Sequence, residues 1–403
     1  MADFKNPYRP GAGHMPPHLA GRGPETKDFI RLLEQETILS NVVLTGLRGV
    51  GKTVLLETWK PTAMSKKWLW VGTDFSESTS VSEDTLVIRL LTDLSIVTSG
   101  IEIIVPNTKM GLTASATETK ERIGFPKLLE LYKETPGLTA DKLKAMLEFV
   151  WKCLQPHGFK GIVFAYDEAQ TMSDHAGKDQ YPLSMLLDVF QSIQKKDIPF
   201  MLVLVGLPTL FPKLVDTRTF SERMFEVITL TKLSPEDSRE AIIQPTTRDN
   251  CPIQFTQSSV ELITTESGGY PYFIQFICRE TYDVFLQQVN MGEEVKSLPI
   301  NEIIRKLDKD FFSGRWGKAT DRQRELLSVI AQLDNCDEEF TVQEIVAEAK
   351  TLANPFSSSL VNQMLSTLIV AGLIYKNRHG KYSFAVPLLG QFILRQERQA
   401  NLF

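Results

Sequence analysis

Short continuous apolar runs alternate with spaced apolar positions over residues 24–232. Residues 161–166 and 200–205 contain only apolar or small side chains, as do strands that are buried on both faces of a sheet. Residues 139–154 instead place apolar side chains every three or four positions, which is typical of an amphipathic helix. This alternation predicts an α/β fold in which helices cover both faces of a doubly wound parallel sheet.

From residue 233 onwards the strand pattern gives way to helical spacing. A Gly-Gly pair at residues 268–269 separates two predicted helices. Near the C-terminus, three helical stretches precede a predicted β-hairpin whose turn is Asn-Arg-His-Gly at 377–380. We expect the third of these helices to begin at Pro355, with Asn354 as its cap. This order of elements is the outline of a winged helix-turn-helix.

The composition shifts along the chain predict four parts. Residues 1–23 form an arm rich in Gly and Pro, and residues 24–232 form the α/β domain. Residues 233–314 form a helical lid, and residues 315–403 form the winged-helix domain. Within the α/β domain, an apolar stretch followed by small polar residues at 98–117 predicts an inserted hairpin.

Composition and charge exclude several classes of protein. The chain has 403 residues, 42 % of them hydrophobic, and no apolar run of membrane-spanning length. The N-terminus has no apolar core of a signal peptide, so a cytoplasmic location without a membrane partner is expected. The four cysteines form no CxxC pair and suit reduced thiols. A net charge of −5 argues against a surface that binds nucleic acid throughout, but not against a local basic patch.

The most specific motif follows the strand predicted at residues 41–45. Residues 46–53 read Gly-Leu-Arg-Gly-Val-Gly-Lys-Thr, which is the P-loop pattern GxxxxGK[ST] between a strand and a helix. Its glycines let backbone N–H groups point at phosphate oxygens, Lys52 reaches the β- and γ-phosphates, and the Thr53 hydroxyl binds Mg²⁺. The predicted ATP-binding residues of this loop are Gly46, Leu47, Arg48, Gly49, Val50, Gly51, Lys52, Thr53 and Val54.

A pair of carboxylates follows the strand predicted at residues 161–166. Open α/β sheets bind ligands at the carboxyl ends of their strands, where Asp167 and Glu168 lie. Asp167 would bind Mg²⁺, and Glu168 would act as general base toward the attacking water. The alternative is two solvated acids at a strand end. With the P-loop, the pair predicts an Mg²⁺-dependent ATPase, in which Glu168 and Lys52 are catalytic.

These motifs resemble those of the AAA+ and STAND classes of P-loop ATPase, especially members with an origin-recognition or Cdc6-like module. The resemblance rests on the P-loop, on Asp-Glu-Ala-Gln at 167–170, on the helical lid and on the winged helix, and it covers nearly the whole chain. It implies an ATP-driven molecular switch. A metabolic kinase is disfavoured, because neither a lid nor a winged helix serves small-molecule phosphoryl transfer.

The resemblance also implies roles for residues outside the two motifs. Gly21 and Arg22 are similar to a segment that packs over adenine, although a merely ordered arm is the alternative. Arg223 resembles an arginine finger that acts on a neighbouring subunit. The alternative is that Arg223 only forms a surface salt bridge. Arg218 is the second candidate for the finger.

The lid departs from the origin-recognition pattern. Tyr272 stands where an arginine that senses the nucleotide is expected, while Tyr270 and Pro271 resemble the Gly-x-Pro of STAND proteins, in which the proline lies near the base. The resemblance therefore implies that Tyr270 and Pro271 pack on the nucleotide. It also implies slow hydrolysis, and it puts ring formation by self-association in doubt.

The winged helix has two alternative partners. Its third helix has no charged residue between positions 351 and 375, whereas the wing carries Lys376, Arg378 and Lys381. These cations predict contacts to DNA phosphates without strong sequence specificity. One alternative is thus a DNA-associated ATPase acting in replication, transposition or defence. The other is a STAND-like regulator that binds a protein partner and no DNA.

Overall fold

The computed structural model describes residues 5–11, 13–106, 118–247, 251–293, 297–378 and 380–400. The chain forms two compact units. The sheet unit consists of Pro24–Thr45 and Leu55–Thr229. The helical unit consists of Met1–Gly23, Gly46–Val54 and Leu230–Phe403. The helical unit therefore includes the loop between the first strand and the next helix, together with the last residue of that strand and the first three residues of that helix.

The sheet unit is built on a five-stranded sheet with the order β2-β5-β6-β1-β7. The pairs β1–β6, β6–β5 and β5–β2 are parallel, which confirms the predicted α/β fold. The edge strand β7 was not expected from the sequence. The strands are β1 (Asn41–Gly46), β2 (Trp68–Val71), β5 (Gly161–Tyr166), β6 (Phe200–Gly206) and β7 (Phe225–Leu230).

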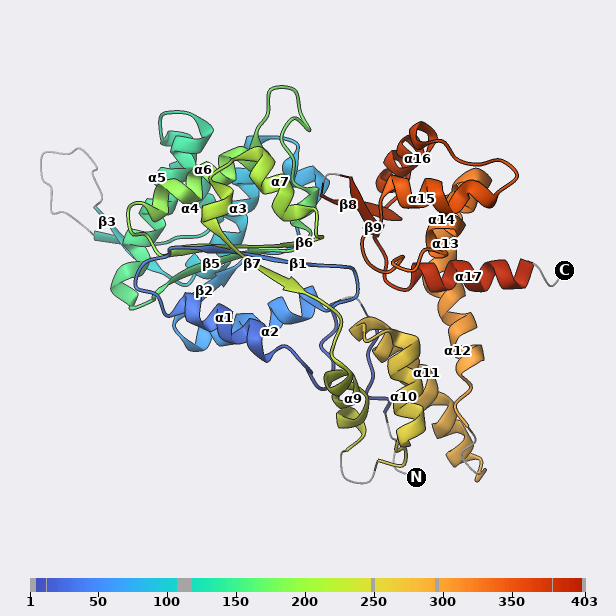
Figure 1. Ribbon diagram of the computed structural model, residues 1–403. Helices are drawn as coiled ribbons and strands as arrows, with labels where there is room; N and C mark the ends of the chain where they lie inside the picture. Colours follow the sequence, from blue (N-terminus) through green and yellow to red (C-terminus); the bar gives the residue numbers. More distant parts are fainter. Residues whose placement is uncertain are drawn as a thin grey trace, which may run out of the picture. The chain divides into compact units, whose positions relative to one another are not determined.

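Helices cover both faces of this sheet, as Figure 1 shows. On one face, α1 (Gly23–Leu33) and α2 (Lys52–Ser65) are joined by the stacked rings of Phe29 and Trp59, 4.4 Å apart. The other face packs against α3 (Glu83–Thr98), α4 (Phe125–Glu134), α5 (Thr139–Leu154) and α6 (Pro182–Gln194). Residues of β1, β5 and β6 are consequently buried on both faces, which explains their continuous apolar runs.

Two smaller features complete the sheet unit. The strands β3 (Glu102–Pro106) and β4 (Glu118–Arg122) pair antiparallel, with Glu102 opposite Arg122. A hairpin is thus present as predicted, but its second strand begins after the predicted end at 117, and residues 107–117 lie outside the described residues. After β6, the helices α7 (Leu210–Thr217) and α8 (Ser221–Met224) lead into β7.

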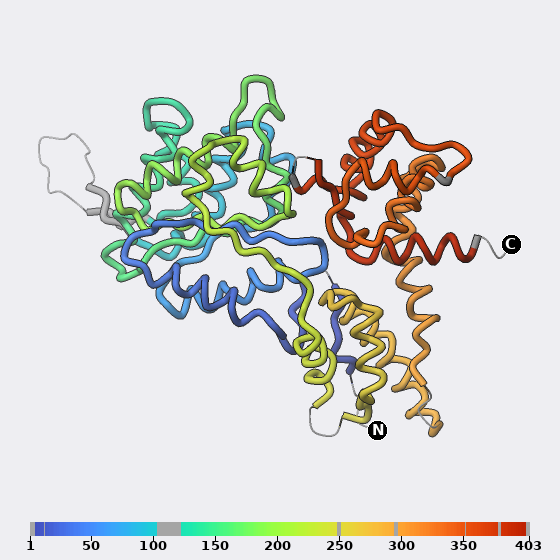
Figure 2. The backbone as a smooth tube through the Cα atoms, viewed as in Figure 1, coloured from blue at the N-terminus to red at the C-terminus, as the bar shows by residue number. Residues whose placement is uncertain are grey.

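The helical unit begins with an N-terminal segment packed on three helices. These are α9 (Pro235–Ile243), α10 (Gln257–Ser267) and α11 (Pro271–Asn290). Tyr8 is fully buried and donates its hydroxyl hydrogen to the carbonyl oxygen of Ile242. Asn6 Nδ2 donates to the carbonyl oxygen of Arg279 at 2.9 Å. Residues 5–11 and 13–22 form no helix or strand, yet Tyr8 and Ala20 belong to the packed core beside these helices, whose course Figure 2 shows.

The remaining elements follow in the predicted order of three helices and a hairpin. One start was wrong: the third helix, α16, begins at Ser358, where the Ser357 hydroxyl accepts from the N–H of Leu360 at 3.3 Å, so Asn354 and Pro355 precede it. The final helix α17 was not expected. The elements are α12 (Ile300–Leu307), a π-helical turn (Asp308–Phe312), α13 (Ser313–Trp316), α14 (Asp321–Ala331), α15 (Val342–Glu348), α16 (Ser358–Val370), β8 (Ile374–Arg378), β9 (Lys381–Phe384) and α17 (Leu389–Ala400).

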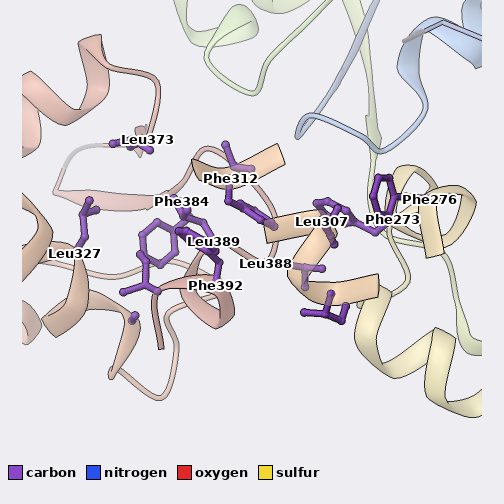
Figure 3. Packing of buried hydrophobic residues seen from close by; sticks show 14 of the residues in the cluster. Phe273, Phe276, Leu307, Phe312, Leu327, Leu373, Phe384, Leu388, Leu389 and Phe392 are labelled. Carbon is purple, nitrogen blue, oxygen red and sulfur yellow. The ribbon is translucent and has the colours of Figure 1, made fainter. Parts of the chain in front are cut away.

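One continuous core runs through the helical unit, as Figure 3 shows. The ring of Phe312 stacks on Phe392 of α17, with centroids 5.0 Å apart, and lies 5.9 Å from Phe273 of α11. Side chains from the start of α11 are thereby connected to the C-terminal helix through the segment around Phe312.

Short 3-10 turns lie at Glu77–Ser80, Gln155–His157, Ala169–Thr171, Gln244–Thr246 and Ala349–Thr351. The longest helix of the described ranges, α11, carries Arg279, Glu280 and Asp283 along its length. Within the part of the chain that the structure describes, no helix combines the length and the apolarity needed to cross a bilayer.

Candidate nucleotide site

The P-loop in the helical unit has a backbone that requires its glycines. Gly46 and Gly49 have φ angles of +155° and +81°. A Cβ at Gly46 would lie 2.5 Å from the carbonyl oxygen of Leu230, and one at Gly49 would lie 3.1 Å from Cβ of Tyr272. Lys52 Nζ donates to the carbonyl oxygens of Gly46 (2.8 Å) and Leu47 (2.9 Å), so the ammonium group is held against the loop.

Arg22 binds this loop directly. Its side chain is buried, and its guanidinium donates to the carbonyl oxygens of Val50 (2.9 Å) and Thr231 (2.8 Å). The neighbouring Gly21 has a φ of +64°, and a Cβ there would lie 2.6 Å from the carboxyl carbon of Asp237. Arg22 thus connects the P-loop to the segment before α9. The predicted contact of Gly21 and Arg22 with adenine stays a prediction.

The first turn of α11 also contacts the loop. The N–H of Tyr272 donates to the carbonyl oxygen of Gly49 at 3.1 Å. Tyr270 and Pro271 occupy the N-cap and first positions of α11. Burial raises the pKa of the Tyr270 hydroxyl, and the charge of Asp337 raises it further, so this side chain lies near the C-terminal elements. The expected packing of Tyr270 and Pro271 on the nucleotide stays a prediction.

The two predicted carboxylates lie at one edge of the sheet unit. Because β1, β6 and β5 pair in parallel, their carboxyl ends meet at the same edge. Asp167 is buried, donates its N–H to the carbonyl oxygen of Thr73 (3.1 Å), and accepts the N–H of Glu168 on Oδ1 (2.7 Å). Glu168 has a φ of +52°, a left-handed conformation that is uncommon for a non-glycine residue and recurs at functional sites.

Gln170 holds the side chain of Glu168, a role that the sequence analysis did not predict. Its amide nitrogen donates to a carboxylate oxygen of Glu168, and its amide oxygen accepts the N–H of Leu207 at 3.2 Å. Lys213 Nζ donates to the carbonyl oxygen of Gln170 at 2.9 Å, and burial lowers the pKa of this lysine. The residue after β6 therefore orients Glu168 through Gln170. The position of Gln170 in the Asp-Glu-Ala-Gln motif was the sequence feature that could have predicted this role.

An ion pair with a buried carboxylate lies beside the strand that carries these carboxylates. Arg89 lies 2.9 Å from Asp93, and it donates to the Thr73 hydroxyl at 2.7 Å. Burial raises the pKa of Asp93, and the Arg89 charge opposes that shift. Phe75 stacks on Tyr166, the residue before Asp167, with ring centroids 4.1 Å apart.

Arg223 lies at the amino ends of the strands, since residues 37–39 precede β1 and Met224 precedes β7. It is exposed and lines a pocket of about 290 Å³. Arg218, the reserve candidate, makes two hydrogen bonds to the Asp188 carboxylate, at 3.0 and 2.9 Å. Because Arg218 is already bonded to Asp188, Arg223 is the better candidate for the arginine finger. That role stays a prediction. The pocket is lined by Thr37, Ile38, Leu39, Gln191, Gln194, Lys195, Phe220, Arg223 and Met224.

The candidate DNA contacts lie on the C-terminal hairpin. Lys376 is exposed, and the backbone register pairs Arg378 with Lys381. Lys381 lies near Glu344, whose pKa is lowered mainly by a hydrogen bond from Thr341 and to a smaller extent by this lysine. His379, in the turn of this hairpin, lies outside the described residues. The exposed positions of α16 include Ser358, Ser359, Asn362 and Gln363.

The residues present suit a magnesium nucleotide. The glycine loop precedes the first turn of α2, which begins with Lys52 and Thr53, and Asp167 supplies a buried carboxylate. The P-loop belongs to the helical unit and the carboxylates belong to the sheet unit.

A parallel five-stranded sheet whose β1 runs into GxxxxGK[ST] has the α/β fold of the P-loop NTPases. Among solved structures, the chain is similar to the Walker-type ATPase of Pyrococcus abyssi, with 15% identity, coverage of 93% of this chain and 96% of that chain, and a TM-score of 0.59. It is also similar to the ORC2 protein of Aeropyrum pernix in its ADP form, with 15% identity, coverage of 96% and 97%, and a TM-score of 0.55. At these identities the likeness concerns the fold.

The sequence comparisons add little to this assignment. Residues 309–393 match a family described as a domain of unknown function (DUF8462). No curated protein matches the chain.

Proposed function

We propose that the protein is an Mg²⁺-dependent ATPase of the AAA+/STAND type that works as a nucleotide-controlled switch. The observation that carries the proposal is the P-loop, in which positive-φ glycines and the Lys52 ammonium form a phosphate-binding backbone. The bond from Tyr272 to Gly49 supports the switch, because it joins this loop to a helix of the proposed lid. The proposal includes the division into arm, ATPase domain, lid and winged helix.

The site residues have separate roles in the proposed reaction. Lys52 exchanges its two carbonyl acceptors in the loop for phosphate oxygens of ATP. Thr53 and Asp167 would hold Mg²⁺, which would supply charge neutralisation at the phosphates. Glu168, oriented by Gln170, accepts a proton from the attacking water. Arg223 serves a neighbouring subunit. Turnover is slow, because Tyr272 replaces the lid arginine that would stabilise phosphate charge.

The proposed output of the switch is association with DNA through the wing. Lys376, Arg378 and Lys381 contribute the positive charge, and the uncharged polar side chains of α16 suit weak sequence preference. A protein partner at the same domain is the second candidate, favoured by the lack of charge between residues 351 and 375.

Nucleotide binding tests the proposal. Affinities for a fluorescent ATP analogue with Mg²⁺ are compared for the natural protein, Lys52→Ala and the control Lys60→Ala, which removes an exposed lysine of α2. Lys52→Ala should weaken binding by at least about tenfold, because a charge-assisted phosphate contact is lost. The control should bind as the natural protein does. Failure of the natural protein to bind ATP would refute the proposal.

A further inference from the structure

The segment from Asp308 to Trp316 reaches the P-loop through a short series of contacts inside the helical unit. Tyr272, whose N–H is bonded to Gly49 of the loop, places its ring 5.1 Å from the ring of Phe311. The guanidinium of Arg315 lies over that same Phe311 ring at 4.7 Å, and it donates to the Phe311 carbonyl oxygen at 2.9 Å. Arg315 is thereby fixed in orientation two side chains away from the P-loop.

A second arginine shares this neighbourhood. Arg48 is an exposed residue of the P-loop itself. Burial lowers the pKa of Arg315, and the positive charge of Arg48 lowers it further. In the parts of the chain that the structure describes, no carboxylate forms an ion pair with either guanidinium. Two neighbouring positive charges without an anion repel each other, and an anion bound to both removes that cost.

We propose that Arg315 and Arg48 together contact the terminal phosphate of ATP bound at the P-loop. The inference rests on the proposed function and assigns to Arg315 the nucleotide sensing that Tyr272 lacks the charge to perform. ATP carries one phosphate more than ADP, so ATP bridges the two arginines and ADP does not. Guanidinium groups suit this task, because they remain charged and present several donors to phosphate oxygens.

The same segment also contacts the last helix, α17. A nucleotide contact made by Arg315 can therefore affect that helix. Asp308 is buried and accepts two hydrogen bonds from Arg395 of α17, at 2.9 and 2.5 Å. Phe312 stacks on Phe392 of α17. Asp308 to Phe312 form a π-helical turn, a conformation often found at functional sites. A shift of Arg315 toward or away from the loop is therefore transmitted to α17.

The test compares ATP with ADP. Affinities for Mg·ATP and Mg·ADP are measured by titration calorimetry for the natural protein, Arg315→Ala and Arg48→Ala. Lys318→Ala is the matched control, since it removes one positive charge from an exposed position near Arg315. Each arginine variant should lose about tenfold in ATP affinity and less than about twofold in ADP affinity. Arg315→Lys should recover only part of the loss, because one ammonium replaces a fork of donors.

The outcomes separate this inference from the proposed function. No binding of either nucleotide to the natural protein would refute the proposed function. Binding by the natural protein, with equal losses for ATP and ADP in both arginine variants, would overturn the inference alone. ATP affinities of both arginine variants equal to that of the Lys318→Ala control would also overturn the inference. Arg48→Ala keeps the test decisive if Arg315→Ala unfolds, because Arg48 is exposed and its removal disturbs no packing.

Discussion

Arg22 shows how much a single buried side chain contributes to the candidate site. Sequence resemblance suggested contact with adenine, whereas in the structure its guanidinium is bonded to two backbone carbonyl oxygens, of Val50 and Thr231. A buried carbonyl group that loses its charged hydrogen-bond donor is left unsatisfied, which destabilises the fold by about 1–3 kcal/mol. The residue therefore stabilises the P-loop whatever else it contacts.

Replacement of Arg22 by Ala should lower both stability and nucleotide affinity. Two carbonyl oxygens lose a charged donor, so the free energy of unfolding should fall by about 2–4 kcal/mol. Chemical denaturation followed by circular dichroism measures this loss. The control is Arg239→Ala on α9, an exposed arginine, for which a change below about 0.5 kcal/mol is expected. Equal stabilities of the two variants would show that Arg22 does not brace the loop.

At the residue level, the sequence predicted the glycine-dependent backbone of the P-loop better than the contacts that support the two motifs. The pattern at 46–53 required glycine where the structure has positive φ angles. It did not predict the left-handed backbone of Glu168 or the bond from Gln170, because no local sequence signal marks a positive φ at a glutamate or a side-chain contact of this kind. Arg315 was missed for a similar reason: it lies in no motif, and only the tertiary fold brings it near Arg48.

At the level of elements, continuous apolar runs predicted the central strands of the sheet. The edge strand and the start of one helix were harder to predict. β7 buries only Phe225, Ile228 and Leu230, and its Glu226 and Thr229 interrupt the apolar pattern. The start of α16 was placed too early because Asn354 and Pro355 carry a strong capping signal, yet Ser357 makes the cap. The N-terminal segment gave only loop signals, although Tyr8 is a fully buried core residue.

The hairpin of β8 and β9 carries the prediction about DNA. Binding of the protein to a DNA duplex is measured with ATP at two or more salt concentrations. Replacing Lys376, Arg378 and Lys381 by Ala should weaken binding and reduce the slope of log affinity against log salt by about 2–3, since each phosphate contact contributes about 0.9.

The control for the DNA prediction removes three positive charges elsewhere. Lys27, Lys60 and Lys152 are exposed lysines of the sheet unit, and their replacement by Ala should leave the salt slope unchanged. Absence of binding by the natural protein at low salt would exclude DNA and leave the protein partner as the output.

At the level of the whole molecule, the two sequence motifs belong to different units of the chain. The helical unit contains the P-loop together with Arg22, Tyr272 and Arg315, and the sheet unit contains Asp167 and Glu168. The sequence showed both motifs, but not that the P-loop contacts the start of α11.

ATP hydrolysis by Glu168→Gln tests the central claim most directly. Phosphate release and Mg·ATP affinity are measured for the natural protein, for Glu168→Gln and for the exposed control Glu222→Gln. The account predicts slow but measurable hydrolysis by the natural protein and the control. It predicts that Glu168→Gln binds ATP within about twofold of them and loses at least about 100-fold in turnover, because the general base is gone. Equal turnover in Glu168→Gln and the natural protein would contradict it.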